Sequence, residues 1–79
     1  NPSTMIEFNL PVSSHARVEV YNLLGEQVNV LVDRNLPAGR YSVTWNGDDL
    51  SGRTAPSGIY FYRLSAGDFS YTRKMMLVK

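Results

Sequence analysis

The chain of 79 residues contains no cysteine and only one histidine, His15. The absence of cysteine excludes disulfides, thiolate metal sites and cysteine nucleophiles. It leaves the cellular compartment open, because exported proteins can also lack cysteine. Any catalytic Ser–His–Asp arrangement would have to use the one histidine.

Long apolar runs and an excess of one charge are also missing. The longest apolar runs, Ile59 to Tyr62 and Met75 to Val78, have four residues each, whereas a helix needs about 20 apolar residues to span a bilayer. Eight basic and seven acidic residues are scattered along the chain and give a net charge of +1. The sequence has no stripe of basic residues of the kind that binds a phosphate backbone. The sequence therefore predicts neither membrane insertion nor nucleic-acid binding.

The length allows a single domain. A chain of this size buries about 60–65% of its unfolded surface and has a stability on the order of 4–12 kcal/mol, which gives little support to a buried active site. The sequence begins with Asn1-Pro2 and shows no signal peptide. We interpret residues 1–79 as one domain taken from a longer protein.

What the sequence does contain is an alternation of apolar and polar residues with a period of two, which is typical of half-buried β-strands. Three runs alternate in this way: residues 5–10, 16–21 and 41–46. A fourth, residues 28–33, predicts Val28, Val30 and Val32 on the inner face. The last two runs, residues 59–64 and 69–78, are apolar on both faces in places, and we expect them to be the most buried pair.

Turn-forming residues separate these runs. Asn22-Leu23-Leu24-Gly25 predicts a type I turn with Gly25 in the left-handed conformation. Leu36-Pro37-Ala38-Gly39 predicts a second turn, and Gly67-Asp68 predicts a two-residue hairpin. The sequence therefore predicts an all-β fold, an antiparallel β-sandwich of six to seven short strands.

The polar stretch after Trp45 is the best candidate for a metal site. Asn46, Asp48 and Asp49 resemble the start of a calcium loop. Counted from Asn46, however, the loop lacks the ligand at the fifth position, the glycine at the sixth and the glutamate at the twelfth. We interpret the stretch as a connecting loop, with no metal and no cofactor.

Catalytic side chains are not predicted either. His15 follows the turn-like stretch Pro11-Val12-Ser13-Ser14, and we expect it to be an exposed loop residue without a catalytic serine partner. The aspartates that could form a carboxylate pair for glycoside hydrolysis lie in or beside turns. The sequence therefore predicts that the domain is not an enzyme.

Aromatic side chains suggest a different site. Five of them could form a flat platform for sugars: Tyr41, Trp45, Tyr60, Tyr62 and Tyr71. Yet Trp45 shares its strand face with Val43 and Tyr41, which favours a place in the core.

The order and spacing of short motifs along essentially all 79 residues resemble a known superfamily. These motifs are Asn1-Pro2, Ile6-Glu7-Phe8, Val18-x-Val20-Tyr21-Asn22-x-Leu24-Gly25-x-x-Val28, Leu36-Pro37-Ala38-Gly39, Trp45-Asn46-Gly47, Gly52, and Ser57 to Leu64. A terminal strand with Lys74 and Lys79 follows. The chain resembles the immunoglobulin-like C-terminal sorting domains of the bacterial type IX secretion system and the related module of flagellar hook-capping proteins.

The resemblance to sorting domains implies a non-catalytic, monomeric immunoglobulin-like C-terminal domain that directs a larger secreted protein through the periplasm to the cell surface. Its partners would be the outer-membrane secretion machinery, a sortase and an upstream catalytic domain of the same chain. The matching recognition residues would be Gly58, Tyr60, Lys74 and Lys79. Met75-Met76 departs from the β-branched pair expected in the last strand.

Two alternatives stay open beside the sorting function. The domain could be a structural or carbohydrate-binding accessory module of a surface glycanase or peptidase, or an immunoglobulin-like piece of a flagellar hook-capping protein that assembles with flagellar subunits.

Overall fold

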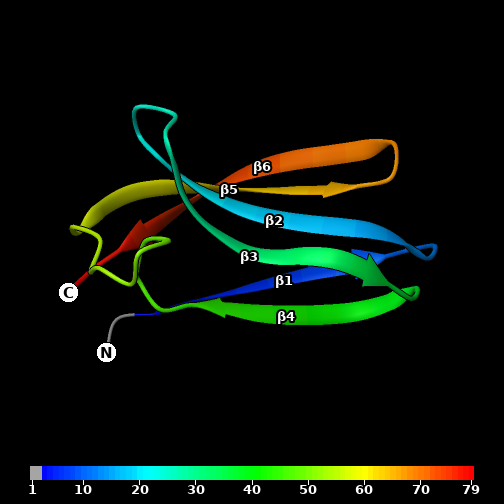
Figure 1. Ribbon diagram of the computed structural model, residues 1–79. Coiled ribbons are helices and arrows are strands. Elements are labelled where there is room, and N and C mark those ends of the chain that lie inside the picture. Colours follow the sequence, from blue (N-terminus) through cyan, green and yellow to red (C-terminus); the bar gives the residue numbers. More distant parts are fainter. Residues whose placement is uncertain (1–2) are drawn as a thin grey trace.

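The computed structural model describes residues 3–79, so the Asn1-Pro2 motif lies outside the described residues. Six strands follow one another along the chain: β1 (Thr4–Leu10), β2 (Ser14–Asn22), β3 (Gln27–Leu36), β4 (Gly39–Trp45), β5 (Gly58–Ala66) and β6 (Phe69–Leu77) (Figure 1). Within residues 3–79 we find no helix of the length and apolarity needed to cross a membrane. The predicted all-β fold of six to seven strands is confirmed.

The six strands form two antiparallel sheets that face each other (Figure 1). One sheet contains only β1 and β4, and the other has the order β3-β2-β5-β6. Strands β3 and β4 are neighbours on one side of the sandwich. Strand β1 consequently lies toward the side of β5 and β6, with its outer edge unpaired.

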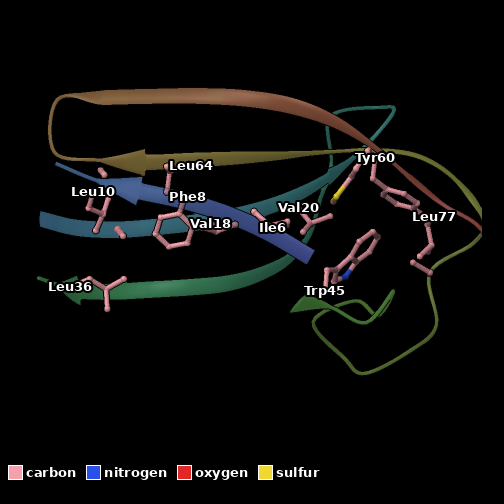
Figure 2. Close-up of a cluster of buried hydrophobic side chains, with 14 residues drawn as sticks. Ile6, Phe8, Leu10, Val18, Val20, Leu36, Trp45, Tyr60, Leu64 and Leu77 are labelled. Carbon is pink, nitrogen blue, oxygen red and sulfur yellow. The ribbon is translucent and has the colours of Figure 1, made fainter. Parts of the chain in front are cut away.

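The core lies between the two sheets and follows the period of two. In β1 the inward side chains Ile6, Phe8 and Leu10 are buried, and Trp45 at the end of β4 is completely buried. They pack against inward side chains of the larger sheet, among them Val18, Val20, Tyr60, Leu64 and Leu77 (Figure 2). Burial of these apolar groups is the main stabilising contribution to the fold.

The predicted burial of the last two strands is wrong for β6. In β6 only Met75 and Leu77 are buried, whereas in β2 every residue from Val18 to Val20 is buried. The reason is position, because β6 is an edge strand and β2 lies between two others. Apolar residues on the outer face of β6, such as Met76, meet solvent.

Strand β3 departs from simple alternation. Its pairing with β2 shifts register between Val18 and Glu19 and again between Val20 and Tyr21. A shift of one residue exchanges the two faces of a strand. Leu31 therefore packs against the core together with Val28 and Val32, and the prediction that Val30 lies inward is wrong.

The predicted hairpin turns are confirmed. Gly25 lies between β2 and β3 with φ of 83°, and Gly67 lies between β5 and β6 with φ of 57°. Both values fall in the left-handed region, which glycine adopts without the clash that a Cβ atom causes.

Candidate functional site

Two irregular segments meet at one end of the sandwich, which we call the loop end. They are the β2–β3 turn, residues 22–26, and the β4–β5 loop, residues 46–57. Figure 1 shows both at the same end of the molecule as the C-terminus. The backbone N–H of Leu50 donates a 3.0 Å hydrogen bond to the carbonyl of Val28 and thereby joins the loop to β3.

The β2–β3 turn is held by one side chain, Asn22. Its Oδ1 accepts hydrogen bonds from the backbone N–H groups of Leu24 and Glu26, each at 3.0 Å. Its Nδ2 donates to the Glu26 carboxylate at 2.8 Å. The backbone of Asn22 also bonds Gly25 and Glu26. An asparagine commonly orders a turn in this way, and here it leaves the two leucines between Asn22 and Gly25 pointing into solvent.

The β4–β5 loop is ordered in the same manner by Asp49. Its Oδ1 accepts hydrogen bonds from the N–H and the hydroxyl of Ser51 and from the N–H of Arg53. The hydrogen bond from the Ser51 hydroxyl is the main cause that holds the pKa of Asp49 below its usual value. Residues 3–79 contain no cluster of three His, Asp or Glu side chains suited to a metal ion. The loop that resembles a calcium loop thus has a structural use for its central carboxylate.

Three of the exposed large apolar side chains among the described residues lie in the two segments of the loop end, and the others, Met5, Val12, Phe69, Met76 and Val78, lie outside these segments. Leu24 is 84% exposed, Leu23 68% and Leu50 63%. A hollow of about 570 Å³ lies between the two segments, with Val28, Ala55 and Tyr60 on its floor and the Asp49 and Glu26 carboxylates among its polar lining. Sequence reasoning did not select these leucines. The available signal was two consecutive leucines inside a turn, where polar residues are usual.

The outer face of β2 and β3 carries a chain of polar contacts. His15 Nε2 lies 2.6 Å from Asp33 Oδ1 and its Nδ1 lies 2.9 Å from Asn35 Oδ1. Arg17 pairs with Asp33 at 2.7 Å and with Glu19 at 3.2 Å. These groups therefore satisfy one another.

Glu19 completes this polar chain. Its Oε2 accepts hydrogen bonds from the hydroxyl of Tyr21 and the amide of Gln27, both at 2.8 Å. Burial acts to raise the pKa of Glu19, but the hydrogen bonds from Tyr21, Arg17 and Gln27 outweigh it and lower the pKa. Glu19 is thus a charged group that is 8% exposed and whose Oε2 has three polar partners, since a buried charge requires partners.

His15 is placed in a strand, not in the predicted loop, because β2 already begins at Ser14. It is exposed, as predicted. Both of its ring nitrogens face acceptor oxygens, so the doubly protonated ring is favoured, and the hydrogen bond to Asp33 is the main cause that raises its pKa. The hydroxyl of Ser14 donates to the carbonyl of Val12. Among the described residues, no serine hydroxyl is hydrogen-bonded to the His15 ring.

One of the four predicted recognition residues does not lie on the surface. Tyr60 is 5% exposed and its hydroxyl donates to the carbonyl of Pro56 at 2.6 Å, so its place in a recognition surface is wrong and it belongs to the core. Gly58 begins β5 opposite Leu77. Lys74 on β6 and Lys79 beyond it are exposed, and their recognition role stays a prediction.

The aromatic side chains do not form a flat platform either. The Trp45 ring packs edge-on against Tyr60 with 4.9 Å between centroids, and Tyr41 stacks on Phe8 at 5.4 Å. The prediction that Trp45 belongs to the core is confirmed. Two of the five aromatics, Tyr62 on β5 and Tyr71 on β6, lie with their ring centroids 6.5 Å apart.

Two sheets of antiparallel strands, closed by hairpin turns, define an immunoglobulin-like β-sandwich. The chain belongs to the FlgD Ig-like domain family, whose model matches residues 2–70. It is also similar to the crystal structure of FlgD from P. aeruginosa, with a TM-score of 0.74 and 32% sequence identity over 95% of this chain. The chain spans 58% of the length of that FlgD chain. No curated protein matches it significantly.

These comparisons confirm the part of the resemblance that concerns hook-capping proteins. They support the hook-cap alternative better than the sorting interpretation, because both matches are to FlgD.

Proposed function

We propose that this chain is a non-catalytic interaction domain of a flagellar hook-capping protein, and that it acts outside the cytoplasm among the subunits of the growing hook. The observation that supports this most directly is the match to the FlgD Ig-like family over residues 2–70. The FlgD neighbour from P. aeruginosa supports the same function. Neither match favours the type IX sorting function.

The arrangement of polar and apolar groups supports a role in protein contacts. The polar groups on β2 and β3 are paired with one another, whereas the leucines of the loop end have no apolar cover. Contiguous exposed apolar side chains typically mark a contact surface, and these leucines come from two segments at the same end of the molecule. Because Asn22 and Asp49 already order the two segments, a partner would lose little entropy by ordering them.

The loop end is therefore the surface that we propose for contacts with flagellar subunits. Leu23 and Leu24 from the turn and Leu50 from the loop would insert into apolar pockets of the neighbour. The hollow of about 570 Å³ between the two segments would receive a side chain in return.

A chimera tests the proposed function. The immunoglobulin-like domain of the P. aeruginosa FlgD is replaced by this chain, and hook length and swimming are measured in a strain that lacks its own FlgD. We expect hooks to form with the chimera and not with a FlgD from which the domain is deleted. A chimera that is exported and folded but gives no hooks would contradict the proposal.

Two variants of the chimera separate the contact surface from the fold. Leu23→Ser with Leu24→Ser should reduce hook assembly while changing the free energy of unfolding by less than about 0.5 kcal/mol, because both side chains are exposed. The control is Met76→Ser, which changes another exposed apolar residue, on β6, and should leave assembly unchanged.

A reporter fusion examines the sorting alternative. The chain is fused behind an exported reporter in a bacterium with the type IX machinery. We expect the reporter to stay in the periplasm. Surface display that is lost with Lys74→Glu and Lys79→Glu would instead support the sorting function and its predicted lysines.

A further inference from the structure

The two sheets of the sandwich differ in width. One has two strands and the other four, whereas immunoglobulin-like sandwiches of the simplest type have about seven strands, with at least three in each sheet. Strand β4 lies next to β3, and β1 crosses in front of β2 and β5 (Figure 2). No strand of the narrow sheet therefore covers the first half of β6.

The exposure of the side chains on the inner face of β6 agrees with this lack of cover. Phe69, Tyr71 and Arg73 pair with Ala66, Leu64 and Tyr62 of β5, so they project toward the side of the core. On this face Met75 is 9% exposed, whereas Phe69 is 40% exposed. The inner face of β6 is thus covered at its C-terminal end and open at its N-terminal end.

The open part of β6 and Tyr62 of β5 together form an aromatic shelf, which we define as Tyr62, Phe69, Tyr71 and Arg73. The Tyr71 ring lies 6.5 Å from the rings of both Tyr62 and Phe69. The Arg73 guanidinium lies 4.9 Å from the centre of the Tyr71 ring. These contacts pre-organise an apolar surface that faces a gap.

The edge of β1 borders this shelf. A hollow of about 390 Å³ is lined by Glu7, Phe8 and Asn9 of β1 and by Tyr71, together with Arg40 and Tyr41 of β4. Within residues 3–79, strand β1 pairs with β4 on one side and with no strand on the other. Its free edge presents alternating backbone N–H and C=O groups, which an additional strand can pair.

We propose that this gap is a strand-binding slot that takes an extended segment of another polypeptide. The segment would pair with the free edge of β1 and become the third strand of the narrow sheet. Every second side chain would then lie on the aromatic shelf, while the others would face solvent. Addition of a strand to a free sheet edge is a common mode of peptide recognition, with affinity from the backbone and specificity from alternate side chains.

The width of the slot favours a single segment over a second copy of this chain. Neighbouring strands are about 4.8 Å apart, and β6 lies beside β5, beyond the strands that β1 crosses. If two copies paired edge to edge through β1, their two β6 strands would have to occupy the same space. An antiparallel pairing centred on β1 would also place Glu7 opposite Glu7 of the second copy, which is unfavourable.

The shelf also indicates the composition of the segment. Strand β1 has seven residues, so a segment of about seven residues with β-branched or aromatic side chains at alternate positions would fill the slot. An acidic side chain near one end would meet the exposed guanidinium of Arg73.

Peptide titration followed by NMR tests the slot. The probe is a synthetic seven-residue peptide of alternating threonine and valine. Two controls have the same side chains but carry N-methyl groups on alternate amides, one for each edge of the peptide. At millimolar concentration we expect the unmodified peptide to shift the amides of Glu7 and Asn9 and of residues 69–73, and to slow amide exchange on β1. At least one N-methylated peptide should lose this effect, because it cannot pair with the edge.

Protein variants then assign the effect to the shelf. Tyr71→Lys should weaken peptide binding about tenfold, since it removes the central aromatic contact. The control Met76→Ser, on the outer face of β6, should bind the peptide like the unchanged chain. Thermal unfolding of each variant without peptide shows that it is folded.

Several outcomes would contradict the proposed strand-binding slot. They are equal shifts with all three peptides, shifts confined to the loop end, and no shift at millimolar peptide. Protection of β1 amides in a concentration-dependent dimer, seen by analytical ultracentrifugation without peptide, would assign the edge to a second copy and reject a partner segment.

Discussion

The indole N–H of Trp45 donates a 2.8 Å hydrogen bond to the backbone carbonyl of Asp48, three residues further along the chain. The side-chain amide of Asn29 donates to the same carbonyl, also at 2.8 Å. Trp45 is completely buried in the core. A single side chain thus fills the core with its ring and orders the start of the β4–β5 loop with its nitrogen.

Replacing Trp45 should therefore destabilise the domain through two separable effects. Trp45→Ala should cost about 3–5 kcal/mol, a large part of the whole stability. Trp45→Phe keeps most of the ring and should cost about 1–3 kcal/mol, because Asn29 still satisfies the Asp48 carbonyl. Urea unfolding measures both values, and native Trp45 fluorescence should be blue-shifted. An alanine variant as stable as the unchanged chain would contradict the core position.

Asn22 gives a second prediction, on the rigidity of the turn that presents the leucines. Asn22→Ala removes three side-chain hydrogen bonds and should cost about 1–2 kcal/mol. The matched control is Asn22→Asp combined with Glu26→Gln, which keeps the oxygen that accepts from the backbone N–H groups of residues 24 and 26 and avoids placing two carboxylates side by side. Urea unfolding should rank the alanine variant below the aspartate variant. Equal stabilities would mean that the side chain does not hold the turn.

The sequence allowed the strands to be predicted because burial of one face imposes a period of two, as in Ile6, Phe8 and Leu10. It failed where the period depends on the partner strand. The position of Leu31 against the core follows from a register shift against β2, and a register shift leaves no mark in the alternation itself. The prediction that β6 is buried failed for a similar reason, because the order of strands in a sheet is a property of the whole fold.

The candidate site was less predictable than the fold. The connecting loop after Trp45 was predicted, because it lacks the ligands of a calcium site, but the hydrogen bonds by which Asp49 orders it were not. Tyr60 was misplaced because an aromatic residue in a strand suits a surface and a core equally well. The exposed leucines and the aromatic shelf depend on what the other sheet leaves uncovered, which the local sequence does not contain.

The polar loop gives a third prediction, on metal binding. Calcium at millimolar concentration should leave the melting temperature unchanged, because an ion that binds only the folded state must raise it and the Asp49 Oδ1 already accepts three hydrogen bonds. Differential scanning fluorimetry with calcium, with magnesium and with a chelator measures this. A rise of several degrees with calcium alone, abolished by Asp49→Asn, would show a metal site instead.

His15 and Asp33 give the last prediction, on the pH dependence of stability. Their contact raises the pKa of His15 and lowers that of Asp33, in each case chiefly through the hydrogen bond between them. The contribution of His15 is complete below its ordinary pKa, about 6.5, and is lost as the pH rises through its higher folded-state value. The contribution of Asp33 is present above its ordinary pKa, about 3.9, and is lost as the pH falls through its lower folded-state value.

The unchanged chain should consequently have a higher melting temperature than His15→Gln. The difference should be largest between about pH 4 and pH 6.5 and should shrink above and below this window. Asp33→Asn is the matched control, since it keeps the shape of the side chain and removes its charge. NMR titration should give a pKa above about 6.5 for His15, and a lower value in the Asp33→Asn variant. Arg17 also pairs with Asp33 at 2.7 Å, so the neutral asparagine should weaken that contact as well. A His15 pKa at or below its ordinary value would show that the contact does not persist in solution.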